Sequence, residues 1–136
     1  MAQDIGIDRA TSGPAATLLT ATVTDTSTSP ASAAVDFGTP TPIKAGYEVK
    51  LDCQASSNGL AYLYVVWSHD NSDFSDASNK VRVTIIDCTA STISIKCGEM
   101  EILARYAKFY LENQSGGSIS NTSTTLTFWD VFGDVA

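Results

Sequence analysis

The stretch Ala61–Trp67 constrains the fold more than any other part of this chain. Its residues, Ala-Tyr-Leu-Tyr-Val-Val-Trp, are apolar or aromatic and favour strands, and a polar cluster beginning at Ser68 follows them. In a strand, side chains alternate between two faces, here Tyr62, Tyr64 and Val66 on one and Ala61, Leu63, Val65 and Trp67 on the other. Because both faces are apolar, we expect this strand to lie centrally in a sheet, or where two subunits meet.

The rest of the chain predicts more strands and little helix. Its 16 Thr residues favour strands, and its 16 Ser residues favour turns. Alternating apolar segments bounded by turn residues predict strands over residues 17–24, 35–38, 46–54, 60–68, 81–88, 92–97, 104–114 and 122–132. A chain of 136 residues is expected to form one domain. We therefore predict an all-β fold: a single antiparallel β-sandwich over residues 17–136, jelly-roll or Greek-key like, preceded by an extended N-terminal arm over residues 1–16.

The turn signals also predict which strands pair. An Asn-Gly turn joins 46–54 to 60–68, and a short connection joins 81–88 to 92–97, so we expect two hairpins. In the second hairpin, the alternation predicts that Ile93, Ile95 and Cys97 face inward. We expect residues 25–34, rich in Thr, Ser, Pro and Ala, to pack little, and residues 98–103 to have room for a helical turn.

Both ends of the chain carry candidate interface residues. The arm offers Ile5 and Ile7 as apolar anchors, and it is either a frayed terminus or a segment that docks on a neighbouring subunit. Near the other end, Trp129, Val131 and Phe132 form a late apolar cluster, which we interpret as a seal against a neighbouring subunit.

Charge and hydropathy exclude several classes of partner. A net charge of −7 repels a phosphate backbone, so we expect no nucleic-acid partner. No apolar run approaches the roughly 20 residues that span a bilayer, and no basic amphipathic helix is evident, so we expect no membrane partner. The first residues lack both the basic and the apolar region of an export signal, so we expect none.

The three cysteines, Cys53, Cys88 and Cys97, have no CxxC spacing. We expect reduced thiols that serve as small buried hydrophobic groups, with a structural disulfide as the alternative. Cys88 and Cys97 are not expected to meet, because they lie at opposite ends of the predicted hairpin. A zinc site lacks ligand pairs, since His69 is the chain's single histidine.

The sequence contains no catalytic or cofactor motif. Asp70, Asp73 and Asp76 gather oxygen atoms in one loop, but they do not match an EF-hand, so an ordinary structured loop is preferred to a calcium site. His69 cannot share a strand face with Ser68 or Asp70, which argues against a nucleophile–base arrangement. The carboxylates Glu99 and Glu101 have no supporting sugar site, so we interpret them as solvated charges.

Aromatic side chains leave one binding alternative open. They form either core and interface contacts or a platform on which sugars stack. The candidates are Trp67, Trp129, Tyr62, Tyr64, Tyr106 and Tyr110.

Two passages carry a family resemblance. The first is Val65-Val-Trp-Ser-His-Asp-Asn-Ser-Asp-Phe74. The second is Ala104-Arg-Tyr-Ala-Lys-Phe-Tyr-Leu-Glu-Asn-Gln-Ser-Gly-Gly117, followed by Thr125-Leu-Thr-Phe-Trp-Asp-Val-Phe-Gly-Asp134. Together they resemble the small virion proteins of tailed bacteriophages, in particular capsid decoration (cement) proteins with a β-sandwich or jelly-roll fold. The resemblance covers residues 46–134 and consists of a pattern of strands and turns.

The resemblance implies a non-enzymatic protein without a cofactor that binds between major capsid protein subunits at symmetry axes, as a homotrimer, on a virion assembled in host cytoplasm. The alternatives are another phage structural component (tail, head–tail connector or baseplate) and a carbohydrate-binding adsorption module. Of the candidate residues, Ile5, Ile7, Tyr62, Tyr64, Trp129 and Phe132 are those we assign to an interface.

Overall fold

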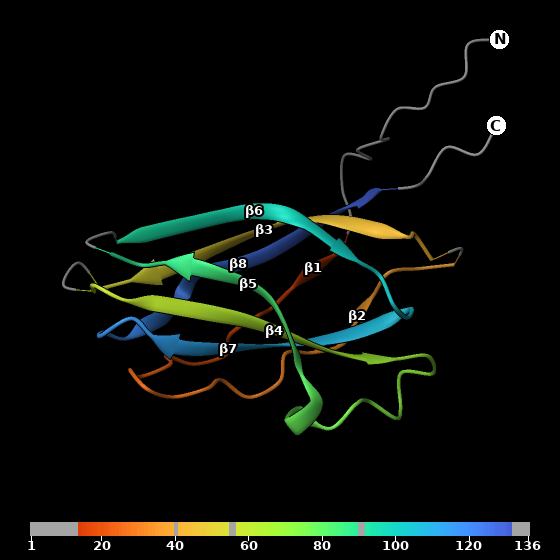
Figure 1. The fold of residues 1–136 in the computed structure, drawn as a ribbon, viewed down its shortest axis with the longest axis horizontal. Coiled ribbons are helices and arrows are strands. Elements are labelled where there is room, and N and C mark those ends of the chain that lie inside the picture. Colours follow the sequence, from red (N-terminus) through yellow and green to blue (C-terminus); the bar gives the residue numbers. More distant parts are fainter. Residues whose placement is uncertain (1–13, 40, 55–56, 90–91, 132–136) are drawn as a thin grey trace, which may run out of the picture.

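The computed structural model describes residues 14–39, 41–54, 57–89 and 92–131, and it is an antiparallel β-sandwich. Its elements are β1 (Ala15–Ala16), β2 (Val35–Asp36), β3 (Lys44–Cys53), β4 (Leu60–Ser68), η1 (Ala77–Asn79), β5 (Val81–Asp87), β6 (Ile93–Glu101), β7 (Tyr106–Gln114) and β8 (Ile119–Val131). Two four-stranded sheets face each other (Figure 1). The first, here the β3 sheet, has the order β1-β8-β3-β6, and the second, the β4 sheet, has the order β2-β7-β4-β5.

The predicted strand Leu60–Ser68 is confirmed with its bounds and both of its faces. It is β4, and it lies between β7 and β5 in its sheet. Its inward residues pack in the core, where Ala61 and Leu63 are fully buried, while Tyr62 and Tyr64 on the outer face are half-buried. The long runs β3, β7 and β8 also confirm the predicted alternation, since Val49, Phe109, Leu126 and their neighbours on the same faces fill the interior.

Both predicted hairpins are wrong. β3 pairs with β6 and β8, whereas β4 pairs with β5 and β7, so the turn after residue 54 carries the chain from one sheet to the other. The connection after β5 does the same, because β5 belongs to the β4 sheet and β6 to the β3 sheet. A short polar turn permits both a hairpin and a crossover, and here burial of two apolar faces between layers favours the crossover.

The N-terminal third of the fold also departs from expectation. The strand predicted over 17–24 is absent from the described chain, which instead forms the short β1 before it and an isolated bridge at Val23. Leu18 and Leu19 are both buried, so this segment inserts consecutive side chains into the core and does not alternate.

The segment 25–34 packs more closely than its composition suggested. Its backbone follows the edge of β7, where the amides of Ser29 and Ser32 donate to the carbonyls of Leu111 and Phe109, both at 2.8 Å. The two serine hydroxyls accept hydrogen bonds from the amides of the same β7 residues, each at 2.9 Å. Because the serine side chains satisfy backbone groups, a segment with little apolar surface can still cover a sheet edge.

One end of the sandwich is closed by an aromatic cluster. Phe128 of β8 meets Phe37 edge to face at 5.2 Å between ring centroids and Phe109 at 5.3 Å. Trp67 contacts Phe37 at 6.2 Å. The described ranges contain one helical element, the single turn η1. It is too short to cross a bilayer.

Candidate interaction surfaces

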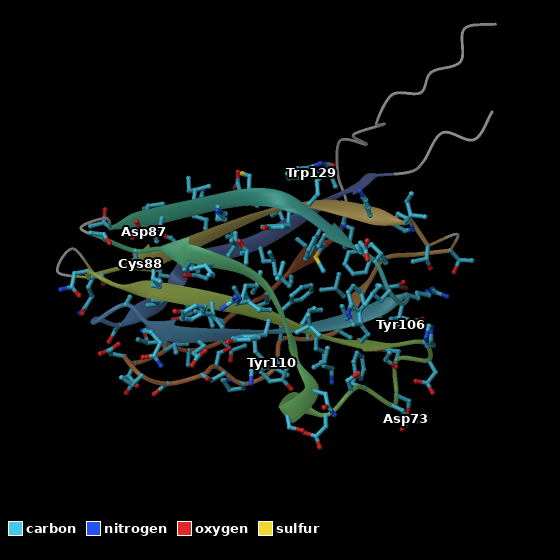
Figure 2. The ribbon with its side chains drawn as sticks, in the orientation of Figure 1. Asp73, Asp87, Cys88, Tyr106, Tyr110 and Trp129 are labelled. Carbon is cyan, nitrogen blue, oxygen red and sulfur yellow. The ribbon has the colours of Figure 1, made fainter. Side chains whose placement is uncertain are left out.

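The outer face of the β3 sheet presents an indole ring placed on a glycine. Trp129 on β8 lies directly opposite Gly46 on β3. A Cβ atom at Gly46 would overlap the indole ring, so the ring rests against the bare backbone of β3. Beyond it lies a cavity of about 380 Å³ lined by Trp129, Cys97, Gly98 and Glu99. Figure 2 shows Trp129 on the outside of this layer.

β6 adds an exposed apolar row to this face and corrects the predicted polarity of the strand. Ile93 is 40% exposed, Ile95 is 55% exposed, and Cys97 is exposed too, although all three were expected to face inward. The register gives the reason. Ile95 lies opposite Lys50 and Cys97 opposite Glu48, and directly opposed residues of antiparallel strands project to the same face. The inward positions of β6 hold Ser94 and Met100 instead.

The outer face of the β3 sheet combines apolar and charged side chains. We call it the β3-sheet surface, and it consists of Trp129, Ile93, Ile95 and Cys97, with Glu48 and Lys50 between them on β3. Exposed threonines of β8, including Thr125 and Thr127, border it. An aromatic and aliphatic centre with charges close by is the composition typical of protein–protein interfaces.

The outer face of the β4 sheet carries four half-buried tyrosines. Tyr62 and Tyr64 come from β4, and Tyr106 and Tyr110 come from β7, with Tyr64 directly opposite Tyr110. The Tyr64 hydroxyl donates to Glu112 Oε1 at 3.0 Å. Burial and this acidic neighbour both raise the pKa of the Tyr64 phenol above its ordinary value.

Cations cover three of these rings. Lys80 Nζ lies 4.9 Å from the ring centroid of Tyr64, and the guanidinium carbons of Arg82 and Arg105 lie 5.7 Å and 5.0 Å from those of Tyr62 and Tyr106. Cation–π contacts of this kind hold the rings in place, and a ligand stacking on them has to displace the cations.

The predicted aromatic platform is therefore divided in three. Tyr106 and Tyr110 lie along β7, in the opposite layer from Trp129 (Figure 2). Trp67 belongs to neither outer face, because its ring packs against the core beside Phe37.

A groove opens along one side of the sandwich, between the edge strands β5 and β6. The two strands lie close together at one end and diverge toward the other, where β5 leads back to η1 (Figure 1). A cavity of about 270 Å³ lies there. Its lining is Val65, Trp67, Val81, Arg82, Val83, Glu99, Met100, Glu101 and Leu103. The helical turn expected over 98–103 is wrong, because β6 continues to Glu101 and supplies one wall.

Sequence reasoning missed the apolar mouth of this groove. Val81 is 56% exposed and Leu103 is 59% exposed. Val81 begins β5 in an alternating row with Val83, which predicts the strand but not its exposure, and Leu103 follows the end of β6, where alternation gives no signal. Glu99 and Glu101, interpreted as solvated charges, are exposed and lie opposite Gly46 and Lys44, so they project to the outer face of the β3 sheet, whereas Arg82 on β5 lies over the Tyr62 ring.

The polar loop after β4 is organised by its own side chains. Asp70 Oδ1 accepts hydrogen bonds from the amides of Ser72 and Asp73, both at 2.9 Å, and from the Ser68 hydroxyl at 2.8 Å. These bonds, the one from Asp73 first, lower the pKa of Asp70 to about 2. Ser68 thus directs its hydroxyl proton to Asp70 and not to His69. Within the described ranges no group of three or more His, Cys, Asp and Glu side chains could hold a metal ion.

The cysteines differ in environment. Cys53 of β3 and Cys88 after β5 are buried free thiols, and they meet between the two sheets. The neighbouring Cys88 thiol lowers the pKa of Cys53 to about 7, against the effect of burial. The Cys53 thiol, together with burial, raises the pKa of Cys88. Cys97 is a free thiol on the outer surface, so Cys88 and Cys97 do not meet, as expected.

Three of the six predicted interface residues are placed, and they do not form one site. Tyr62 and Tyr64 lie on one outer face and Trp129 on the other. Ile5, Ile7 and Phe132 lie outside the described residues.

Comparison with known proteins supports the fold. No family model matches the chain, and no curated protein matches it. A similar solved structure is that of murine APRIL at pH 8.5, with a TM-score of 0.51 and 8% sequence identity over 88% of this chain and 98% of that one. At this identity the likeness concerns the fold alone. The chain is thus an all-β protein whose two antiparallel sheets form a jelly-roll-like sandwich.

Proposed function

We propose that this chain is a non-enzymatic structural protein of a phage virion that decorates the capsid and stabilises it by binding between major capsid protein subunits, as a homotrimer. The observation that carries the proposal is the β3-sheet surface, where Ile93, Ile95 and Trp129 are presented outward on a rigid sheet. The fold itself does not require apolar side chains at these positions, whereas a protein partner would use them.

Binding energy in protein interfaces concentrates in a few buried aromatic and apolar anchors. Trp129 is suited to this role, because its contact with Gly46 fixes the ring before any partner binds. A protein that buries such an anchor between neighbouring subunits adds interface area that must be broken before they separate. It thereby stabilises the assembled shell by mass action, and no chemical step is needed.

The test is binding of purified protein to assembled capsids and to unassembled capsid protein. We expect co-sedimentation with capsids only, and a trimer by light scattering. Trp129→Ala should weaken capsid binding by about 30-fold or more, as expected for a hot-spot aromatic residue. Thr127→Ala is the matched control, since Thr127 is exposed two residues away on the same face. If Trp129→Ala and Thr127→Ala bind capsids equally well, Trp129 does not contact the capsid and the β3-sheet surface is not the binding surface.

Binding to virions without binding to capsids would identify a tail, connector or baseplate component. Labelled protein located by electron microscopy on intact virions distinguishes these sites from the capsid surface.

The tyrosines of the β4 sheet favour a second candidate, a carbohydrate-binding module used in adsorption. Tyr64 and Tyr110 lie side by side on one outer face, and sugars stack on such rings. A glycan array with the wild type, Tyr64→Ala and Tyr64→Phe tests this candidate. A stacking site should be lost in Tyr64→Ala and kept in Tyr64→Phe, which retains the ring but not the hydroxyl that donates to Glu112.

A further inference from the structure

Two thiols and a hydroxyl are buried together at one end of the sandwich, where the chain crosses between the two sheets. Cys53 is the last residue of β3 and Cys88 directly follows β5, so the thiols come from different sheets. Figure 2 shows Cys88 at this end. Cys53 Sγ donates to the hydroxyl of Ser94, on β6, at 3.8 Å. None of the three residues is more than 5% exposed.

Backbone hydrogen bonds hold the two cysteines at the same level of the sandwich. The Cys53 amide donates at 2.8 Å to the carbonyl of Thr92, which lies just before β6. The Cys88 amide donates at 3.0 Å to the carbonyl of Gly59, which lies just before β4. Each cysteine is therefore bonded to the segment that the chain enters after the other cysteine, and the two thiols are fixed beside each other.

The surroundings of the pair divide the roles of the two sulfur atoms. The Cys88 thiol, and after it the Ser94 hydroxyl, lower the pKa of Cys53 to about 7, whereas the Cys53 thiol and burial raise the pKa of Cys88. Near neutral pH Cys53 is thus the sulfur that ionises, and the Ser94 hydroxyl can rotate to donate to the thiolate. Since the thiolate is the reactive form of cysteine, Cys53 is the attacking group.

We propose that Cys53 and Cys88 form a peroxide-oxidisable pair that closes a disulfide between the two sheets, with Ser94 as the positioning residue. The inference is independent of the capsid proposal, because it concerns a covalent bond inside one chain.

The reaction takes two steps and consumes one hydrogen peroxide. The Cys53 thiolate attacks one peroxide oxygen, the O–O bond breaks, and the departing hydroxide takes up a proton and leaves as water. Cys53 is then a sulfenic acid. The Cys88 sulfur attacks the Cys53 sulfur, the S–O bond breaks, and the hydroxyl leaves with the Cys88 proton as a second water. Two thiols have lost two electrons, and one peroxide has been reduced to two waters.

The position of the pair suits a small oxidant. Gln54 and Thr89, the residues that follow the two cysteines, are both exposed, so each thiol lies one residue from the surface. Hydrogen peroxide has two heavy atoms and needs a much smaller opening than a bulky aromatic thiol reagent.

The bond would enclose the chain from Cys53 to Cys88, which contains all of β4 and β5. A disulfide stabilises a fold mainly by restricting the unfolded chain. The oxidised protein should therefore melt about 5–15 °C above the reduced protein. A Tm that is unchanged or lower would overturn this stabilising role.

Peroxide treatment of full-length Cys97→Ser protein tests the proposal, since this variant lacks the exposed thiol. After treatment at pH 7 and removal of the peroxide, the monomer should be about 2 Da lighter and show no free thiol when unfolded. Peptide mass spectrometry should find Cys53 joined to Cys88, and dithiothreitol should restore both thiols. Two remaining thiols, unlinked cysteines carrying added oxygen, or a disulfide between two molecules would each overturn it.

A pair of serine variants tests the role of Ser94. Ser94→Ala should slow disulfide formation about three- to tenfold at pH 7 and move the rise of the rate to higher pH, because the thiolate loses a hydrogen-bond donor. Ser57→Ala is the matched control, since its hydroxyl is also buried but has no hydrogen-bond partner among the described residues. The control should keep the parent rate and pH profile. Identical profiles for the two variants would remove Ser94 from the proposal.

Discussion

The indole ring of Trp129 rests on the backbone of Gly46, its neighbour across the β3–β8 pair. The absence of a side chain at Gly46 is what allows the ring to lie flat against the sheet. The orientation of the main aromatic anchor of the β3-sheet surface is thus set by a residue on another strand.

Gly46→Ala should destabilise the protein by about 1–3 kcal/mol, because the added methyl group collides with the indole ring. Urea unfolding gives the free energy of unfolding, and near-ultraviolet circular dichroism reports the displaced ring. The control is Gly46→Ala made in the Trp129→Ala variant. Because that variant has no indole ring to collide with, the loss of unfolding free energy should be much smaller there. If the two costs are equal, the residues are not coupled.

Asn113→Ala should cost about 2–4 kcal/mol of unfolding free energy, because it leaves several buried groups without partners. The Asn113 side chain is fully buried, donates to the carbonyls of Val23 and Gly117, and accepts from the Ser115 amide and hydroxyl. Asn121→Ala, at an exposed site on β8, should change stability by less than about 0.5 kcal/mol. Similar values for both would show that the buried network contributes nothing specific.

The loop after β4 should make stability depend on pH through Asp70. The folded state holds the pKa of Asp70 at about 2, below its unfolded value near 3.9. Its contribution is therefore complete above about pH 4 and is lost as the pH falls toward about 2. Asp70→Asn should lower Tm at pH 7, and the difference from wild type should shrink over that range.

Asp73→Asn is the control for this titration, because it removes one charge from the same loop and keeps the hydrogen bonds to Asp70. A Tm difference for Asp70→Asn that is constant from pH 7 to pH 2 would show that these bonds do not stabilise the fold.

Thiol titration should distinguish the three cysteines. In native protein Ellman's reagent should react rapidly with one thiol, Cys97, and with all three after unfolding. The lowered pKa of Cys53 does not make it reactive, because burial denies the reagent access. Cys97→Ser should abolish the rapid phase, and a rapid phase that persists in this variant would mean that the core opens readily.

Strand positions could be predicted from the sequence, whereas strand partners could not. Alternation identified β3, β4, β7 and β8, because in a long strand every second side chain points to the same face, so a buried face leaves an apolar residue at every second position. Pairing depends on which sheet the chain enters after a turn, and the turn after residue 54 has the same local chemistry for a hairpin and for a crossover.

The polarity of β6 shows why one of the interaction surfaces was missed. Its isoleucines suggested an inward face, but the register with β3 directs them outward, beside Lys50 and Asp52. The tyrosine face was predictable, since Tyr62 and Tyr64 alternate with a strongly apolar set. Val81 alternates with Val83 and Ile85, which predicts a strand but not the exposure of Val81, and Leu103 follows the end of β6, where alternation gives no signal.

The strand order has a consequence for synthesis on the ribosome. Among the described strands, β3 pairs with β6 and β8, and β8 is the one that comes latest in the sequence. The β3 sheet must therefore remain incomplete while about 70 further residues emerge, as most of its pairings are distant in sequence. The nascent chain has to keep β3 from pairing wrongly during this interval, and the charges that alternate along it, Lys44, Glu48, Lys50 and Asp52, provide a means of doing so.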